Sequence, residues 1–327
     1  TGMELWKSNG TATGTVLVKD IYPGAGNSYP ASLTAVGGTL YFGANDGVTG
    51  NELWKSDGTE AGTTQVKDIY FGINGSFPAF LTAVGDTLYF TTDAAAGTTE
   101  LWKSDGTLAG TTLVKVVSAA LAEDFPPYLT AVGNTLYFRA YDTTYGYELW
   151  KSNGTALGTT LVKDINAGPG HGSSGGSSNF IAIGSTVYFT ASDATFGAEL
   201  WKSDGTEFGT TRVKDINTGV GGSFPSALTA VGNTLYFAAY DDTHGTELWK
   251  SDGTEVGTVL VKDIVAGTTN SYLNNFTPVG PSLYFIAEDD ANYDRELWKS
   301  NGTETGTQRV IDLNAGNPPG VTAILNR

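Results

Sequence analysis

Cysteine is absent from the 327-residue chain, which excludes disulfides, thiolate metal sites and a cysteine nucleophile. Only two histidines occur, His171 and His244, and they lie in different segments, so the sequence indicates no Ser-His-Asp triad and no histidine-rich metal site. No apolar run approaches the roughly 18 residues of a membrane span, and no signal peptide is visible. Basic residues are also few. The 18 Lys and Arg stand against 34 Asp and Glu, and the net charge of −16 disfavours nucleic acid and favours cations as partners.

What the chain does contain is one unit repeated many times. The segment Glu-Leu-Trp-Lys-Ser recurs at intervals of 48 to 51 residues, beginning at Glu4, Glu52, Glu100, Glu148, Glu199, Glu247 and Glu296. Three more pieces recur between these markers, a Leu-Thr-Ala-Val run, a Leu-Tyr-Phe run and a Val-Lys-Asp-Ile run. Each is short, rich in β-favouring residues and bounded by Gly, Asp or Asn turn signals. Four short strands in a unit of this length are typical of one blade of a β-propeller.

The two ends of the chain complete the count of blades. Residues 1–21 carry only the third and fourth strands of a unit, and residues 321–325 align with the first strand. We therefore expect an all-β protein, a seven-bladed β-propeller of four-stranded antiparallel blades that forms one domain over 1–327. The seventh blade is shared between both termini and closes the ring. Its second strand is missing from the sequence, so either this blade has three strands or the native chain extends beyond one end. Because the chain opens within a repeat, we expect it to be part of a longer or processed product.

The string from Glu52 to Thr59, Glu-Leu-Trp-Lys-Ser-Asp-Gly-Thr, resembles the bacterial ELWxxDGT repeat family over essentially the whole chain. The resemblance implies a repeat protein that is secreted or attached to the bacterial cell surface. It implies no catalytic residues. The Asp of this turn is replaced by Asn9, Asn153 and Asn301 in sister copies. We therefore interpret the Asp-Gly-Thr segment as a turn rather than a metal site.

The tryptophans stand at one position of the repeat and are the only ones in the chain. They form either a ring of sugar-stacking platforms or the packing between neighbouring blades, and a large flat side chain in a strand favours the packing interpretation. We expect the following residues in the structural core: Trp6, Trp54, Trp102, Trp150, Trp201, Trp249 and Trp298.

Two carboxylates flank the connector between the second and third strands. Four connectors read Asp-x-x-x-Gly-x-Glu, with the pairs Asp46 and Glu52, Asp142 and Glu148, Asp193 and Glu199, and Asp241 and Glu247. Such oxygen ligands suit Ca²⁺, and calcium is the one cofactor that the sequence suggests. The alternative is structural, with Asp capping the loop and Glu bonding to backbone or pairing with lysine. The third unit has Ala94 in place of Asp, which weakens the metal hypothesis.

The variable loops indicate where a partner binds. Connections in a four-stranded meander alternate between two edges, and the less repeated loops share one of them. Recognition commonly uses such loops on a rigid scaffold. The candidate contacts on this face are the residues before the connector glycine or at the aligned place: Tyr145, Phe196, His244 and Tyr293.

The sequence therefore predicts a non-catalytic extracellular module that binds a protein or glycan at the cell surface, or serves a structural role there. A calcium-dependent lectin is the alternative, and a glycan-active hydrolase or lyase is the third possibility. Nucleic acid binding and membrane insertion of this segment are not expected.

Overall fold

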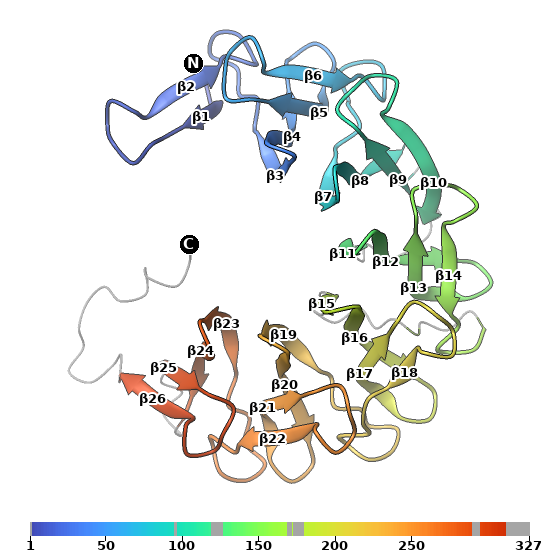
Figure 1. Cartoon of the computed structure of the whole chain (residues 1–327), viewed down its shortest axis with the longest axis vertical. Helices are drawn as coiled ribbons and strands as arrows, with labels where there is room; N and C mark the ends of the chain where they lie inside the picture. The colour runs from blue at the N-terminus through green and yellow to red at the C-terminus, as the bar shows by residue number, and fades with distance from the viewer. Residues whose placement is uncertain are drawn as a thin grey trace. The chain divides into compact units, whose positions relative to one another are not determined.

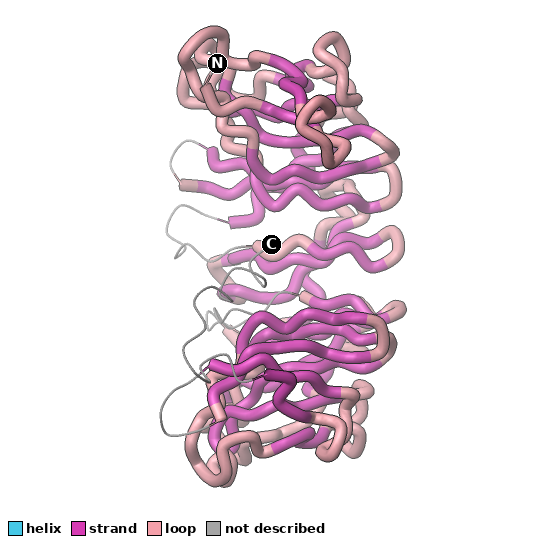
Figure 2. Tube along the Cα trace, turned by 90° about the vertical axis from the view of Figure 1, so that its left-hand side faces the viewer, coloured by secondary structure: helices cyan, strands magenta, loops and turns pink. Residues whose placement is uncertain are grey.

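The computed structural model describes residues 2–94, 97–118, 127–168, 172, 180–289 and 295–311. Every regular element along these residues is a β-strand (Figure 2). Successive antiparallel strands form one two-stranded sheet and six four-stranded sheets (Figure 1). The predicted all-β repeat architecture is confirmed. The chain divides into two compact units, residues 1–143 with 150–161 and residues 144–149 with 162–327.

The four strands of each repeat are here called a, b, c and d in chain order: a is the Leu-Thr-Ala-Val run, b the Leu-Tyr-Phe run, c the Glu-Leu-Trp-Lys run and d the Val-Lys-Asp-Ile run. The first sheet has only strands c and d, β1 (Leu5–Lys7) and β2 (Val16–Lys19). The second sheet is β3 (Ala31–Val36), β4 (Thr39–Asn45), β5 (Asn51–Ser56) and β6 (Thr64–Lys67). The third is β7 (Ala79–Val84), β8 (Thr87–Ala94), β9 (Thr98–Ser104) and β10 (Thr112–Ser118). The fourth is β11 (Thr130–Val132), β12 (Thr135–Asp142), β13 (Gly146–Ser152) and β14 (Thr160–Lys163).

The last three sheets repeat the same order. The fifth is β15 (Ile181–Ile183), β16 (Thr186–Asp193), β17 (Gly197–Ser203) and β18 (Thr211–Arg212). The sixth is β19 (Ser226–Val231), β20 (Thr234–Asp241), β21 (Gly245–Ser251) and β22 (Val259–Lys262). The seventh is β23 (Asn274–Val279), β24 (Ser282–Glu288), β25 (Arg295–Ser300) and β26 (Gln308–Ile311). The predicted closing strand at 321–325 lies outside the described residues, so ring closure stays a prediction.

The core lies between consecutive sheets, because strands b and c are buried on both faces. In β20, Leu235, Tyr236 and Phe237 are all buried, although alternating side chains point to opposite faces. One hydrophobic cluster joins Leu200 and Val213 of the fifth sheet to Phe237 and Trp249 of the sixth. Packing of sheet against sheet explains why the Leu-Tyr-Phe run has no polar position.

Tryptophan burial agrees with the packing interpretation at five positions and corrects it at one. The buried residues are Trp54, Trp150, Trp201, Trp249 and Trp298, and Trp102 is partly buried. Trp6 is 52% exposed, so its predicted place in the core is wrong. Trp54, for example, packs on Leu5 and Val18 of the preceding sheet. Within its unit the described residues supply no sheet before β1, which leaves the Trp6 indole uncovered.

The turn edge of the sheets is formed by the a–b turns and the c–d turns, and its repeated residues serve the backbone. Asp57 accepts hydrogen bonds from Thr59 N at 2.8 Å and Thr59 Oγ1 at 2.7 Å, and Asn153 accepts the same pair from Thr155. Asp and Asn are interchangeable here because both offer this oxygen. The left-handed residue of the turn is the glycine that follows, with φ 85° at Gly58.

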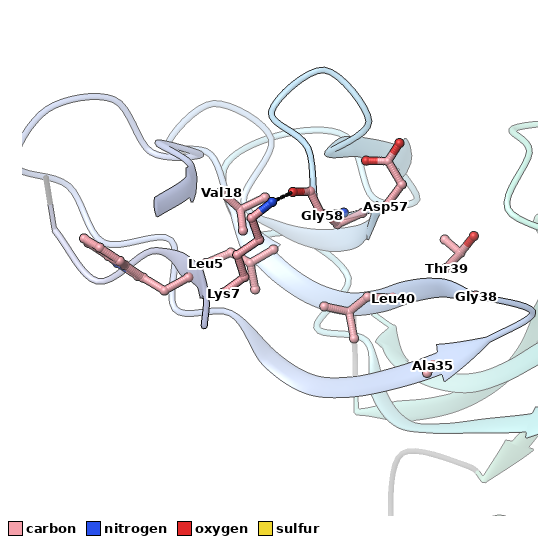
Figure 3. Close-up of a pocket in the computed structure, with 11 residues that line it drawn as sticks. Leu5, Lys7, Val18, Ala35, Gly38, Thr39, Leu40, Asp57 and Gly58 are labelled. Atoms are coloured by element: carbon pink, nitrogen blue, oxygen red, sulfur yellow. Dashed lines mark hydrogen bonds between the residues drawn. The ribbon is translucent and has the colours of Figure 1, made fainter. Parts of the chain in front are cut away.

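Lysine side chains of one sheet donate hydrogen bonds to the c–d turn of the next sheet. Lys7 Nζ of β1 donates to Gly58 O of the next sheet at 2.7 Å, beside a pocket of ≈300 Å³ at the seam between the two sheets (Figure 3). Lys55 reaches Gly106 O at 2.8 Å in the same way. Strand d contributes a second contact, from Lys67 Nζ to Thr111 O at 2.8 Å. The repeated lysines therefore join sheets rather than only face solvent.

Candidate functional site

The loop edge, opposite the turn edge, is formed by the b–c connectors and the d–a loops. Its aspartates cap the connectors. Asp46 Oδ1 accepts hydrogen bonds from Val48 N at 2.8 Å and Thr49 N at 2.7 Å. Asp193 and Asp241 accept from the backbone two and three residues on in the same way. These caps fix the turn that precedes strand c.

The connector glycine is required by a close backbone approach. Gly197 has φ 68°, and a Cβ added there would lie only 2.7 Å from Val220 O in the d–a loop. Gly245 has φ 71°, and its Cβ would lie 2.8 Å from Thr268 O. Only glycine lets the d–a loop cross the connector at this distance. Loop capping thus explains the aspartate of the Asp-x-x-x-Gly-x-Glu pattern, and the close approach of the d–a loop explains its glycine.

Six of the seven glutamates at the head of strand c are buried, and Glu100 is partly buried. Five of the buried ones bind the d–a loop of their own sheet. Glu199 accepts backbone N–H groups from Ile216 at 3.2 Å and Asn217 at 3.4 Å. The same carboxylate accepts the Ser223 hydroxyl at 2.5 Å. The serine follows the glutamate by 24 residues in four copies: Glu4 and Ser28, Glu52 and Ser76, Glu199 and Ser223, and Glu247 and Ser271. In the fourth sheet Glu148 accepts Gly172 N at the same spacing.

Burial raises the pKa of these glutamates. Loss of solvent raises the pKa of Glu148 to about 8 and those of Glu199 and Glu247 to about 7, more than their hydrogen bonds lower them. The pKa of Glu52 is raised for the same reason. Connector aspartates and buried glutamates therefore bond to different parts of their own chain. No cluster of three or more His, Cys, Asp or Glu able to hold a metal ion occurs among the residues that the structure describes. The calcium hypothesis gains no support from them.

The serine held by the glutamate also joins neighbouring sheets. Ser223 N donates to Ala198 O of the fifth sheet at 2.9 Å, and Ser223 O accepts Tyr240 N of the sixth sheet at 2.8 Å. Ser76 makes the equivalent pair, with Asn51 O at 2.9 Å and Asp93 N at 3.2 Å. Each such serine is therefore fixed by its side chain, its N–H and its carbonyl oxygen.

The residue after this serine is an exposed aromatic in a left-handed backbone conformation. The set, here called the aromatic tier, has φ values of 45° to 50° and exposed fractions of 51 to 63%, and it comprises Tyr29, Phe77, Phe224 and Tyr272. Tyr128 shares the conformation, with φ 46°, and is partly buried. A left-handed conformation costs an L-residue about 1–2 kcal/mol and is unusual for a bulky one. Sequence reasoning missed this set, although an aromatic follows the glutamate by 25 residues in five of the seven repeats.

The predicted partner contacts differ in their surroundings. Tyr145 is exposed on its connector. The ring of Phe196 lies under the Arg212 guanidinium, with 3.3 Å between Cζ and the ring centroid. His244 Nδ1 lies 2.9 Å from Asp241 Oδ2, and this hydrogen bond raises the pKa of the imidazole. Tyr293 lies outside the described residues. Two of the four candidates are therefore engaged by their own chain.

No helix among the described residues is long and apolar enough to span a membrane. Neither family models nor curated proteins match the chain. Solved structures are similar to it. Oligopeptidase B from Leishmania major is 10% identical, with a TM-score of 0.52, over 94% of this chain and 44% of that chain.

Two further structures are similar at lower scores. Prolyl oligopeptidase B from Galerina marginata is 10% identical, with a TM-score of 0.49, over 92% of this chain and 44% of that one. TolB from Acinetobacter baumannii is 10% identical, with a TM-score of 0.41, over 83% of this chain and 63% of that one. The chain spans less than half the length of the two peptidases. At this identity the likeness to oligopeptidase B carries the fold alone, and that fold is a β-propeller.

Proposed function

We propose that this chain is a non-catalytic binding module that works outside the cell and recognises its partner through the loop edge. The observation that carries the proposal is the aromatic tier. Phe224 is 63% exposed and left-handed, so its ring buries little apolar surface while its backbone costs free energy. Strained backbone conformations cluster at functional sites, and exposed aromatics are typical of binding surfaces.

Repetition supports binding over catalysis. The first, second, fifth and sixth sheets present the same Glu-Ser-aromatic arrangement, whereas an active site is normally built once. Ionisable groups of the loop edge are engaged within the chain, as Glu199 is by Ser223 and as His244 is by Asp241. The extracellular setting rests on the resemblance to ELWxxDGT repeats described above.

The proposal is tested by comparing variants on the two edges. The loop-edge variant is Phe77→Gly/Phe224→Gly, and the matched turn-edge variant is Leu157→Ala/Phe208→Ala, which removes two exposed apolar side chains from the c–d turns. Both are screened by surface plasmon resonance against immobilised bacterial surface polysaccharides and surface proteins. We expect binding by the wild-type chain and the turn-edge variant and loss in the loop-edge variant. Loss in the turn-edge variant alone, or turnover of a panel member by the pure protein, would contradict the proposal.

A further inference from the structure

The aromatic tier is held rigidly, which suits a preformed binding platform. Phe224 N donates to Ala198 O at 3.0 Å, and the preceding Ser223 is fully buried. On the other side, Pro225 O accepts the Thr190 hydroxyl at 2.7 Å. Phe77 is fixed similarly, with its N–H 3.0 Å from Asn51 O and Pro78 after it. Because the backbone is already ordered, a ligand that contacts these rings orders little more on binding.

The exposure of the rings indicates what they contact. Exposed fractions of 51 to 63% leave much of each side chain open to a ligand. A sugar ring carries C–H groups on one face, and these pack on the electron-rich face of an aromatic ring. Amide side chains stand close by, since Asn27 Nδ2 donates to Tyr29 Oη at 3.2 Å and Asn274 Nδ2 donates to Tyr272 O at 3.1 Å. Amides beside an aromatic ring can orient sugar hydroxyls.

The first unit also has a groove between strands a of neighbouring sheets. It has a volume of ≈360 Å³ and lies between β3 and β7, which Thr34 Oγ1 links to Leu81 O at 3.1 Å. Exposed Leu33 and Phe80 line it, and Phe80 is itself left-handed, with φ 53°. In the sequence its lining starts at Ser32, three residues after Tyr29, and at Ala79, two residues after Phe77.

Charge and repetition narrow the class of ligand. The net charge of −16 repels anionic polymers. A protein partner is usually recognised by one contiguous apolar centre, whereas the tier offers single rings, each preceded by a buried serine and repeated from sheet to sheet. Equal platforms match a ligand whose own units repeat, because weak contacts then add through multivalency.

We propose that the aromatic tier binds neutral polysaccharide by stacking sugar rings, without a metal ion, on the pair Tyr29 and Phe77 of the first unit and on the pair Phe224 and Tyr272 of the second. This inference rests on the proposed function and assigns its ligand class. The platforms are therefore not the tryptophans, most of which are buried, but the exposed tier residues.

Isothermal titration calorimetry tests the inference with soluble dextran, laminarin and galactomannan, and with alginate as the acidic control. We expect binding to at least one neutral polysaccharide, none to alginate, and the same Kd in EDTA. Phe224→Gly should weaken binding about tenfold, since a stacked ring contributes about 1.4 kcal/mol. Phe224→Trp should retain affinity, and so should Phe71→Ala, because Phe71 is a 93% exposed phenylalanine outside the tier.

The inference would be overturned by the absence of binding to any of the three neutral polysaccharides, or by equal affinity in Phe224→Gly. Loss of binding in EDTA would also overturn it. If the polysaccharides fail while an immobilised surface protein binds the wild-type chain and not Phe77→Gly/Phe224→Gly, the ligand class is wrong and the proposed function stands. If no partner distinguishes that variant from the wild-type chain, both are wrong.

Discussion

The turn edge and the loop edge are both repeated from sheet to sheet, but they repeat different kinds of residue. On the turn edge, Asp57 and Thr59 bond to each other in water, while exposed tips such as Leu157 and Phe208 vary. On the loop edge the repeat includes a buried carboxylate, Glu199, and a left-handed exposed aromatic, Phe224. Turn-edge repetition is explained by backbone geometry. Loop-edge repetition includes features that cost stability, and such features call for a functional reason.

Trp249 lies in strand c, between the two edges, and its replacement should give the largest loss of stability. Trp249→Ala should lower the free energy of unfolding by about 3–5 kcal/mol, because a buried indole is replaced by a cavity. Trp6→Ala should cost less than about 1 kcal/mol, because this indole is half exposed. Urea denaturation of both variants measures the difference. Equal costs would mean that Trp6 is buried in solution.

Glu199→Ala should give the largest effect on the loop edge. Removing the carboxylate leaves the Ser223 hydroxyl and the Ile216 N–H buried without their acceptor, which costs about 3 kcal/mol. Glu199→Gln keeps an acceptor oxygen and should cost less. The turn-edge control Asp252→Ala removes an exposed acceptor whose place water takes, so its cost should be smaller still. An Ala variant at position 199 as stable as the wild-type chain would remove the structural role assigned to the glutamate.

The two edges should respond to pH with opposite signs. Glu199 and Glu247 have pKa values raised by burial from 4.5 to about 7, so the folded chain binds more protons than the unfolded chain between these values. Their contribution to stability is complete below pH 4.5 and is lost as the pH rises through about 7. Hydrogen bonds from Thr59 lower the pKa of Asp57, whose contribution is present above 3.8 and lost as the pH falls through its lower folded value.

The pH prediction is checked by urea midpoints from pH 5 to 8. Midpoints should fall over this range in the wild-type chain and fall less in Glu199→Gln/Glu247→Gln, which lacks two of the titrating groups. A midpoint that rises from pH 5 to 8 in the wild-type chain would contradict the assigned pKa directions.

The smallest effect is expected at the tips of the turn edge. Phe208 is almost fully exposed at a c–d turn, so Phe208→Ala should change the free energy of unfolding by no more than about 0.5 kcal/mol. Binding should be unchanged as well, as measured in the calorimetric titration described above. A clear loss of affinity in Phe208→Ala would show that the binding site lies on the turn edge.

Local pattern was sufficient to predict the strands and the caps. Period and turn residues placed every Glu-Leu-Trp-Lys run in a strand, and a structural role for Asp46 was open from its position before a glycine. The structure assigns that role.

Tertiary contacts decided the rest. The acceptor role of Glu52 toward Ser76 spans 24 residues and depends on how the d–a loop crosses the connector. The left-handed turn at Phe77 follows from that crossing and not from residue propensity. A constant spacing between glutamate, serine and aromatic was the available signal, hidden by loops of varying sequence between them. The exposure of Trp6 depends on which sheet precedes β1, which a repeat does not specify.

The central claim is that the loop-edge aromatics serve recognition and not folding. Unfolding free energy and polysaccharide affinity measured on one preparation of Phe77→Gly/Phe224→Gly test it directly. Glycine relieves the left-handed conformation and removes two exposed rings, so we expect stability within about 1 kcal/mol of the wild-type chain and loss of binding. A variant that loses several kcal/mol of stability and still binds would show that the aromatic tier is part of the fold rather than the site.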